Sequence, residues 1–168
     1  MVIVLMGVSG SGKTTLGRLL AERLHWSFCD ADDYHSPQNV AKMRGGQPLT
    51  EEDRRAWIEQ LSWAIRGWMD RSRGVVLACS ALTRAARRHL GVHESGVELV
   101  YLHGPRELLA RRLDHRVGHY FPRGLLQSQL DALQEPSSAH HVDVSEPPEQ
   151  VIQRILHVLK LVPPNTTL

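Results

Sequence analysis

One short stretch near the start of the chain has the residue types and spacing to bind a polyphosphate: Gly7-Val8-Ser9-Gly10-Ser11-Gly12-Lys13-Thr14. Its glycines allow the backbone to fold into a nest of N–H groups around one anion, and a helix that begins at Lys13 adds the positive end of its dipole. In this spacing the Lys13 ammonium reaches the β- and γ-phosphates, and the Thr14 hydroxyl binds Mg²⁺. We therefore predict a phosphate-binding loop (P-loop) for a nucleoside triphosphate, with contacts from Gly7, Val8, Ser9, Gly10, Ser11, Gly12, Lys13, Thr14 and Thr15.

A cluster of carboxylates, Asp30-Ala31-Asp32-Asp33, follows a short strand predicted over Trp26 to Asp30. We predict that Asp30 holds a water molecule of the magnesium ion. Asp32 is the residue expected to orient an attacking hydroxyl and to accept its proton. The alternative interpretation of the cluster is a capped loop with solvated aspartates, which turn preferences alone also allow.

The hydrophobic pattern predicts the scaffold that brings these groups together. Strands are expected at Val2 to Met6, Trp26 to Asp30, Val75 to Ala78, Glu98 to Leu102 and His141 to Val144. Helical spacing predicts helices between them, and Thr50 followed by acidic residues is a strong helix start. Alternation of strands and helices implies a parallel sheet with right-handed crossovers. The carboxyl ends of the strands would then border one crevice. The segments expected there are the P-loop, residues 30–33, residues 79–82 and residues 103–105.

The second half of the chain contains a candidate lid. A glycine- and proline-bounded turn, Val117 to Pro122, lies between helices predicted from Pro105 to Arg116 and from Leu125 to Gln134. Such a turn can close over a bound substrate and exclude water. A last helix is expected from about Pro148 to Leu161.

Composition limits the partners and the location. The 168 residues carry 20 basic and 18 acidic side chains, a formal net charge of +2, so bulk charge gives no case for a nucleic-acid or membrane partner. The run Met1 to Met6 is too short for a membrane span or a signal sequence, and we expect a soluble cytoplasmic protein. Cys29 and Cys79 fit reduced thiols better than a disulfide framework.

A P-loop alone does not separate a kinase from a GTPase switch or a motor module. GTPase switches carry an Asn-Lys-x-Asp motif that reads guanine, whereas neither Asn39 nor Asn165 is followed by lysine. A small chain with carboxylates after its second strand and an arginine-rich lid resembles instead the small-molecule kinases of the shikimate and nucleoside-monophosphate type.

The resemblance is closest to the gluconokinase family. Motifs shared with that family follow one another along the chain: Asp30-Ala31-Asp32-Asp33-Tyr34-His35, Lys42-Met43, Pro48-Leu49, Asp53-Arg54, Cys79-Ser80-Ala81-Leu82, Arg112-Leu113, Arg116, Gly118-His119-Tyr120-Phe121-Pro122 and Leu125-Leu126-Gln127-Ser128-Gln129. They span residues 7 to about 136 and are far more specific than the P-loop. The chain departs from the family pattern after Leu82, where Thr83 replaces a usual lysine and Ala86 a usual tyrosine.

The resemblance implies a fold and a reaction. The fold is an α/β P-loop kinase sandwich of three layers, with a five-stranded parallel sheet in the order 2-3-1-4-5, flanking helices and a mobile lid. The reaction is transfer of the ATP γ-phosphate to the 6-hydroxyl of D-gluconate, with ATP and Mg²⁺ as cofactors. We expect one domain over residues 1–168, with a substrate-binding region at about 33–70 and the lid at about 117–124. A homodimer is expected from family resemblance alone.

The resemblance also assigns roles to side chains. Arg112 would lie near the adenine and Arg116 on phosphate, and Lys13, Asp32 and Arg116 would be the catalytic residues. Candidates for the acceptor site are Asp32, His35, Lys42, Arg54, Arg87 and His119. Arginine suits bidentate binding of a carboxylate, although Arg54 and Arg87 fit solvated helix surfaces equally well.

Two other functions remain open at this point. One is a kinase of another small polyol or sugar acid, similar to shikimate kinase. The other is a nucleotide-binding regulatory module that hydrolyses its nucleotide slowly and binds a protein partner. The Asp32 and His119 motifs argue against the regulatory module, because a switch has no use for a polyol-shaped pocket.

Overall fold

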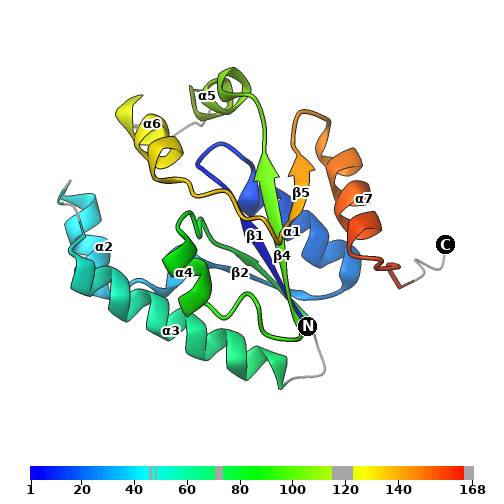
Figure 1. Cartoon of the computed structure of the whole chain (residues 1–168), viewed down its shortest axis with the longest axis horizontal. Helices are drawn as coiled ribbons and strands as arrows, with labels where there is room; N and C mark the ends of the chain where they lie inside the picture. The colour runs from blue at the N-terminus through cyan, green and yellow to red at the C-terminus, as the bar shows by residue number, and fades with distance from the viewer. Residues whose placement is uncertain (46, 48, 71–73, 115–122, 165–168) are drawn as a thin grey trace.

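The computed structural model describes residues 1–45, 47, 49–70, 74–114 and 123–164. Strands and helices alternate along the chain (Figure 1). The strands are β1 (Val2–Met6), β2 (Ser27–Asp30), β3 (Val75–Ala78), β4 (Val97–His103) and β5 (His140–Asp143). The helices are α1 (Lys13–Leu24), the 3₁₀ turn η1 (Ala31–Tyr34), α2 (Pro37–Arg44), α3 (Glu51–Met69), α4 (Arg84–His89), α5 (Arg106–Asp114), α6 (Arg123–Ala132) and α7 (Pro148–Val158).

The strands form a parallel five-stranded sheet in the order β2-β3-β1-β4-β5, as predicted. β1 lies at its centre and is buried along its whole length, which explains its uninterrupted apolar sequence. The loop that leaves β1, together with α5 and α6, lies at the carboxyl edge of the sheet (Figure 1). This is the edge at which open parallel sheets bind ligands.

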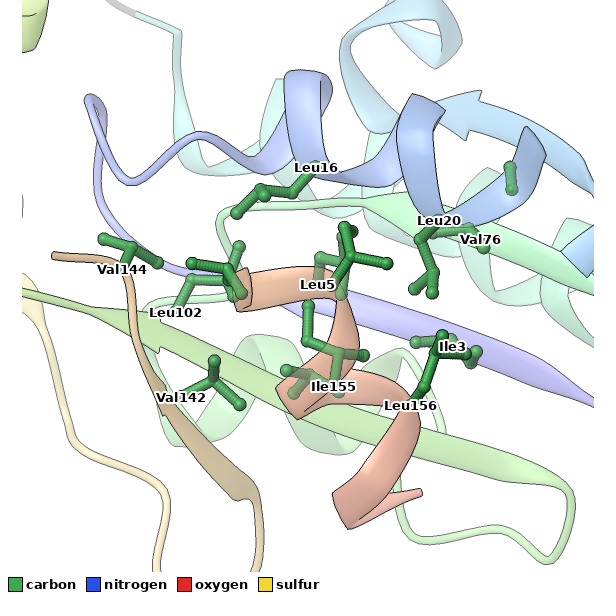
Figure 2. Close-up of a cluster of buried hydrophobic side chains, with 14 of the residues drawn as sticks. Ile3, Leu5, Leu16, Leu20, Val76, Leu102, Val142, Val144, Ile155 and Leu156 are labelled. Carbon is green, nitrogen blue, oxygen red and sulfur yellow. The ribbon is translucent and has the colours of Figure 1, made fainter. Parts of the chain in front are cut away.

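Two apolar clusters cover the two faces of the sheet. On one face Ile3 and Leu5 of β1 pack with Leu20 of α1 and Ile155 of α7 (Figure 2). On the other face Val2, Val4 and Met6 pack with Leu61, Ile65 and Trp68 of α3. Alternate residues of one buried strand therefore serve opposite clusters, and the chain forms the three layers that the sequence predicts.

Helix starts follow local sequence closely. The Thr50 hydroxyl accepts a hydrogen bond from the Asp53 amide, and the Asp53 carboxylate accepts one from the Thr50 amide, which is a complete capping box. Of the tryptophans on this helix, Trp68 is buried in the core, whereas Trp63 is 75% exposed. Within the described part of the chain, no helix has both the length and the apolarity needed to cross a bilayer.

The packing of α7 on the sheet gives a stability prediction. Ile155 is fully buried between the helix and the strands (Figure 2), so Ile155→Ala should lower the free energy of unfolding by about 2–5 kcal/mol, from lost transfer energy and the cavity left behind. Val162→Ala is the control, because that side chain is 85% exposed and its truncation should change stability by less than about 0.5 kcal/mol. Denaturant unfolding of both variants measures the difference, and equal values would contradict this account of the core.

Candidate active site

The P-loop has the backbone geometry that its glycines predict. Gly10 has a φ of 84°, in the left-handed region, and a Cβ there would lie 2.6 Å from the Leu109 carbonyl oxygen of α5. At Gly7 a Cβ would lie 2.5 Å from the carbonyl oxygen of Leu102 in β4. Side chains at either position would push the loop away from its neighbours. The loop therefore fits closely against β4 and α5 and leads directly into the N-terminus of α1, where an anion is favoured.

Lys13 and Thr14 begin α1 and face polar groups. The Lys13 ammonium donates to the carbonyl oxygens of Gly7 and Val8, at 3.0 and 3.1 Å. The Thr14 hydroxyl donates to Asp30 Oδ2 at 2.9 Å, so the end of β2 meets the start of α1. A hydroxyl beside a carboxylate is an oxygen donor set suited to Mg²⁺. The structure thus brings together the two residues predicted to serve the metal.

Asp32 stands in an environment that disfavours its charge. The residue is exposed, yet the protein atoms around its carboxyl group displace water, and this desolvation raises its pKa. The negative charge of Asp30 raises the pKa further, while His35 and Lys13 partly oppose the shift. A carboxylate with a raised pKa is a stronger base, which is the property required of the residue that accepts a hydroxyl proton.

His35 and Trp57 hold the turn that carries Asp32. The His35 ring stacks on the Trp57 ring with centroids 4.5 Å apart and planes at 14°. The Trp57 indole Nε1 donates to the Ala31 carbonyl oxygen at 2.8 Å. Burial lowers the pKa of His35, and its Nδ1 is buried with no hydrogen-bond partner among the described residues. Trp57 therefore ties η1 to α3, a role that its helical spacing alone does not reveal.

The P-loop borders a cavity of about 960 Å³, called here the donor cavity. Its walls include Lys13, Thr14, Asp30, Asp32 and Arg112. Residues after β5 and at the start of α7 also line it: Val144, Glu146, Pro148 and Val151. The sequence prediction overlooked this wall, although it follows the carboxyl end of a strand, where the same rule would have placed it. Arg112 is fixed there, because its Nη2 donates to the Val144 carbonyl oxygen at 2.7 Å.

A second cavity, of about 720 Å³, adjoins the first and is called here the acceptor cavity. It lies between α3, the loop after β3, α4 and α6. The residues common to the walls of both cavities are Cys79, Ser80 and Gln129. Arg54 and Trp57 line the acceptor cavity from α3, and Ala86, the position of the departure from the family pattern, lines it from α4.

Three of the predicted acceptor residues do not line either cavity among the residues described: His35, Lys42 and Arg87. The Lys42 ammonium is bonded to Asp53 Oδ2 at 2.6 Å. Arg87 is 4% exposed and its Nη1 donates to the carbonyl oxygens of Ala81 and Leu82, both at 3.0 Å. In this structure Arg87 holds the loop after β3, so its contact with an acceptor stays a prediction.

The predicted catalytic residue Arg116, the predicted acceptor residue His119 and most of the predicted lid lie outside the described residues.

Of the cysteines, Cys79 is buried between the cavities, and burial raises its pKa to about 12. Both cysteines are free thiols, as expected from the sequence. At neutral pH a thiol with this pKa stays protonated and is a poor nucleophile.

Comparison with known proteins finds kinases that are similar to this chain. The shikimate kinase family model matches residues 9–160. A probable gluconokinase of Xenopus tropicalis is 42% identical, over 92% of this chain and 91% of that protein. A sugar kinase from Janibacter has a TM-score of 0.84 at 41% identity, covering 96% of this chain and 95% of that one. A gluconokinase from Sinorhizobium meliloti has a TM-score of 0.81 at 38% identity, covering 94% and 90%. This chain is therefore similar to gluconokinases over nearly its whole length.

The pair Lys42–Asp53 gives a pH-dependent prediction. The hydrogen bond from Lys42, and then that from the Thr50 amide, lower the pKa of Asp53 from 3.8 to about 2. This carboxylate therefore stabilises the fold fully above its unfolded pKa, and the contribution is lost as pH falls through about 2. Asp53→Asn should lower the melting temperature at neutral pH, and the gap to wild type should close between about pH 4 and pH 2.

The matched control is Glu52→Gln, which removes an exposed ion pair with Arg55 in the same helical turn. This change should move the melting temperature little at any pH, because exposed pairs contribute little. Thermal unfolding of the wild type and both variants from pH 7 to pH 2 makes the comparison. A gap for Asp53→Asn that stays constant over this range would show that the ion pair is not its cause.

Proposed function

This chain belongs to the gluconokinase family, and on that premise we propose that it transfers the γ-phosphoryl group of ATP to the 6-hydroxyl of D-gluconate. The products are 6-phospho-D-gluconate and ADP. One observation supports this proposal above the others: a phosphate-binding cavity adjoins a second cavity, and the two share the wall formed by Cys79, Ser80 and Gln129. A phosphoryl group can pass only between substrates held side by side and in line.

The donor cavity fits a magnesium–ATP complex. Its P-loop would cradle the β- and γ-phosphates, and Arg112 would lie near the adenine. Mg²⁺ would be held by the Thr14 hydroxyl and, through water, by Asp30. The ion supplies neutralisation of charge on the phosphate oxygens. The bond between Thr14 and Asp30 supports this assignment, because it keeps both oxygens at one place beside the P-loop.

The chain's own residues supply positioning and charge. Lys13 stabilises the charge that develops on the transferred phosphoryl group, and Arg116 adds a second positive charge. Asp32 orients the 6-hydroxyl of the acceptor and takes its proton on a carboxylate oxygen as the new O–P bond forms. Arg54 would bind the acceptor carboxylate, and its exposure in the wall of the acceptor cavity supports this role. His119 is a further proposed acceptor contact. His35, Lys42 and Arg87 are proposed as well, although they line neither cavity in this structure and would have to move to reach the acceptor.

A coupled spectroscopic assay tests the proposed activity by measuring the release of ADP in the presence of ATP, Mg²⁺ and one acceptor at a time. Gluconate should stimulate ADP release, and shikimate, glucose and nucleoside monophosphates should not. Lys13→Ala should abolish the reaction with every acceptor, because the loss of a preorganised charge at the phosphates costs orders of magnitude in rate. Stimulation by shikimate or another polyol acid, but not by gluconate, would favour the related sugar-acid kinase. ATP hydrolysis that ignores every acceptor would favour the regulatory module.

Asp32→Asn separates proton transfer from metal binding. The variant should lower kcat by about 10²–10⁴-fold, the usual contribution of a general base. Its dissociation constant for ATP with Mg²⁺, measured by calorimetry, should stay within about twofold, because the nucleotide contacts are unchanged. Asp33→Asn is the control, since it removes a neighbouring charge from the same turn and should leave kcat nearly unchanged. A large rise in the ATP dissociation constant of Asp32→Asn would instead place Asp32 on the metal.

Two wider properties belong to this proposal: a cytoplasmic location, where ATP is the available donor, and a homodimeric state. The sequence supports the first, because the run Met1 to Met6 is too short for a membrane span or a signal sequence, and family resemblance supports the second. Sedimentation of the purified chain tests the second, and a monomer at the concentrations of the activity assay would remove it.

A further inference from the structure

Gln129 links the helix α6 to the P-loop. It lies on α6, and its Oε1 accepts a hydrogen bond of 2.6 Å from the amide of Ser9 in the P-loop. The two residues are 120 positions apart in the sequence. Gln129 is also one of the residues common to the walls of the donor and acceptor cavities. A side chain at this junction, bonded to the phosphate loop, can act on both substrates.

The helix that carries Gln129 contacts both cavities with neighbouring residues. Leu125 and Gln129 line the donor cavity, whereas Ser128, Gln129 and Ala132 line the acceptor cavity. Figure 1 shows α6 beside the loop that leaves β1, at the carboxyl edge of the sheet. An acceptor bound against Ser128 and Ala132 would therefore contact the same helix that holds Ser9.

The segment after α6 is tied to the acceptor side in the same way. Gln134 Oε1 accepts from the Arg84 amide at 2.7 Å, and the Gln134 amide donates to the Leu82 carbonyl oxygen at 2.9 Å. These hydrogen bonds fix the start of this segment to the loop after β3 and to the first residue of α4. Residues 129–134 thus bridge the P-loop and the loop that walls the acceptor cavity.

We propose that Gln129 is a positioning residue of the phosphoryl transfer, which holds the P-loop in its nucleotide-binding shape and couples the two cavities through α6. Ser9 is the residue through which it acts. An acceptor that orders α6 reduces the conformational freedom of the P-loop, so that ATP binds with a smaller loss of entropy. By thermodynamic linkage ATP must then strengthen acceptor binding by the same factor. The coupling with gluconate rests on the proposed function, but the effect on nucleotide binding does not.

The test uses calorimetric binding of AMPPNP, a non-hydrolysable ATP analogue, with Mg²⁺ and the full-length chain. The variant Gln129→Met keeps the size of the side chain and removes the hydrogen bond. Without acceptor it should bind AMPPNP about three- to tenfold more weakly than wild type, the effect of losing one such bond. Saturating gluconate should tighten AMPPNP binding to wild type by about two- to tenfold and leave the affinity of Gln129→Met nearly unchanged.

Gln127→Met is the matched control, because the same substitution falls two positions away on an exposed face of α6, where Gln127 Nε2 bonds to Asp131. This variant should resemble wild type in both arms. Thermal unfolding of each variant separates a loss of folding from a loss of coupling, since a purely structural role for Gln129 would move the melting temperature and not the response to gluconate.

Two results of these binding measurements would overturn the proposal, and a third would concern the acceptor alone. Equal AMPPNP affinities for the Gln129→Met and Gln127→Met variants would overturn it, and so would a gluconate response preserved in Gln129→Met. If wild type shows no heat of gluconate binding, the proposed acceptor is wrong. The acceptor-free arm then decides the role of Gln129 by itself.

Discussion

The site depends on the close packing of the P-loop against its neighbours, the loop after β3 and the strand β4. Where β1 ends, the Gly7 amide donates to the Ser80 carbonyl oxygen at 3.3 Å, and the Gly7 α-carbon lies so near Leu102 that a Cβ would meet its carbonyl oxygen. The first contact ties the phosphate loop to the loop after β3, and the second ties it to β4. These two contacts hold the start of the loop, at Gly7, in place. Phosphoryl transfer relies on such preorganisation more than on covalent chemistry.

The loop after β3 has a matching internal support. Ala81 adopts a positive φ of 45°, a conformation that costs a non-glycine residue energy. The buried guanidinium of Arg87 donates to the carbonyl oxygens of Ala81 and Leu82, which offsets that cost and keeps the loop at the wall of both cavities. Burial of this cation lowers its pKa, a sign that part of its solvation has been lost. The buried Arg87 guanidinium, hydrogen-bonded to carbonyl oxygens, therefore supports the loop after β3 on the side away from the cavities.

The features that the sequence predicted correctly are those that depend on interactions between residues close together in the chain. The P-loop glycines, the buried β1 and the helix start at Thr50 all depend on residues close together in the chain, and each forms as expected. The parallel sheet and its order followed from alternation and from family resemblance. Cavity contacts between distant segments were harder to predict. The bond of Gln129 to Ser9, the indole bond of Trp57 and the enclosure of Arg87 join residues whose spacing carries no periodic signal.

The two cavities differ in how they are built, and this difference explains why the donor side was easier to identify. Much of the donor cavity's phosphate-binding surface comes from one loop and one helix N-terminus, so a short motif encodes it. The acceptor cavity takes its walls from α3, the loop after β3, α4 and α6. Ala86, where the family resemblance implies a tyrosine, lines one of these walls and is not among the residues that line the donor cavity. Substitutions on these separate elements can therefore reshape this cavity while the P-loop motif stays unchanged.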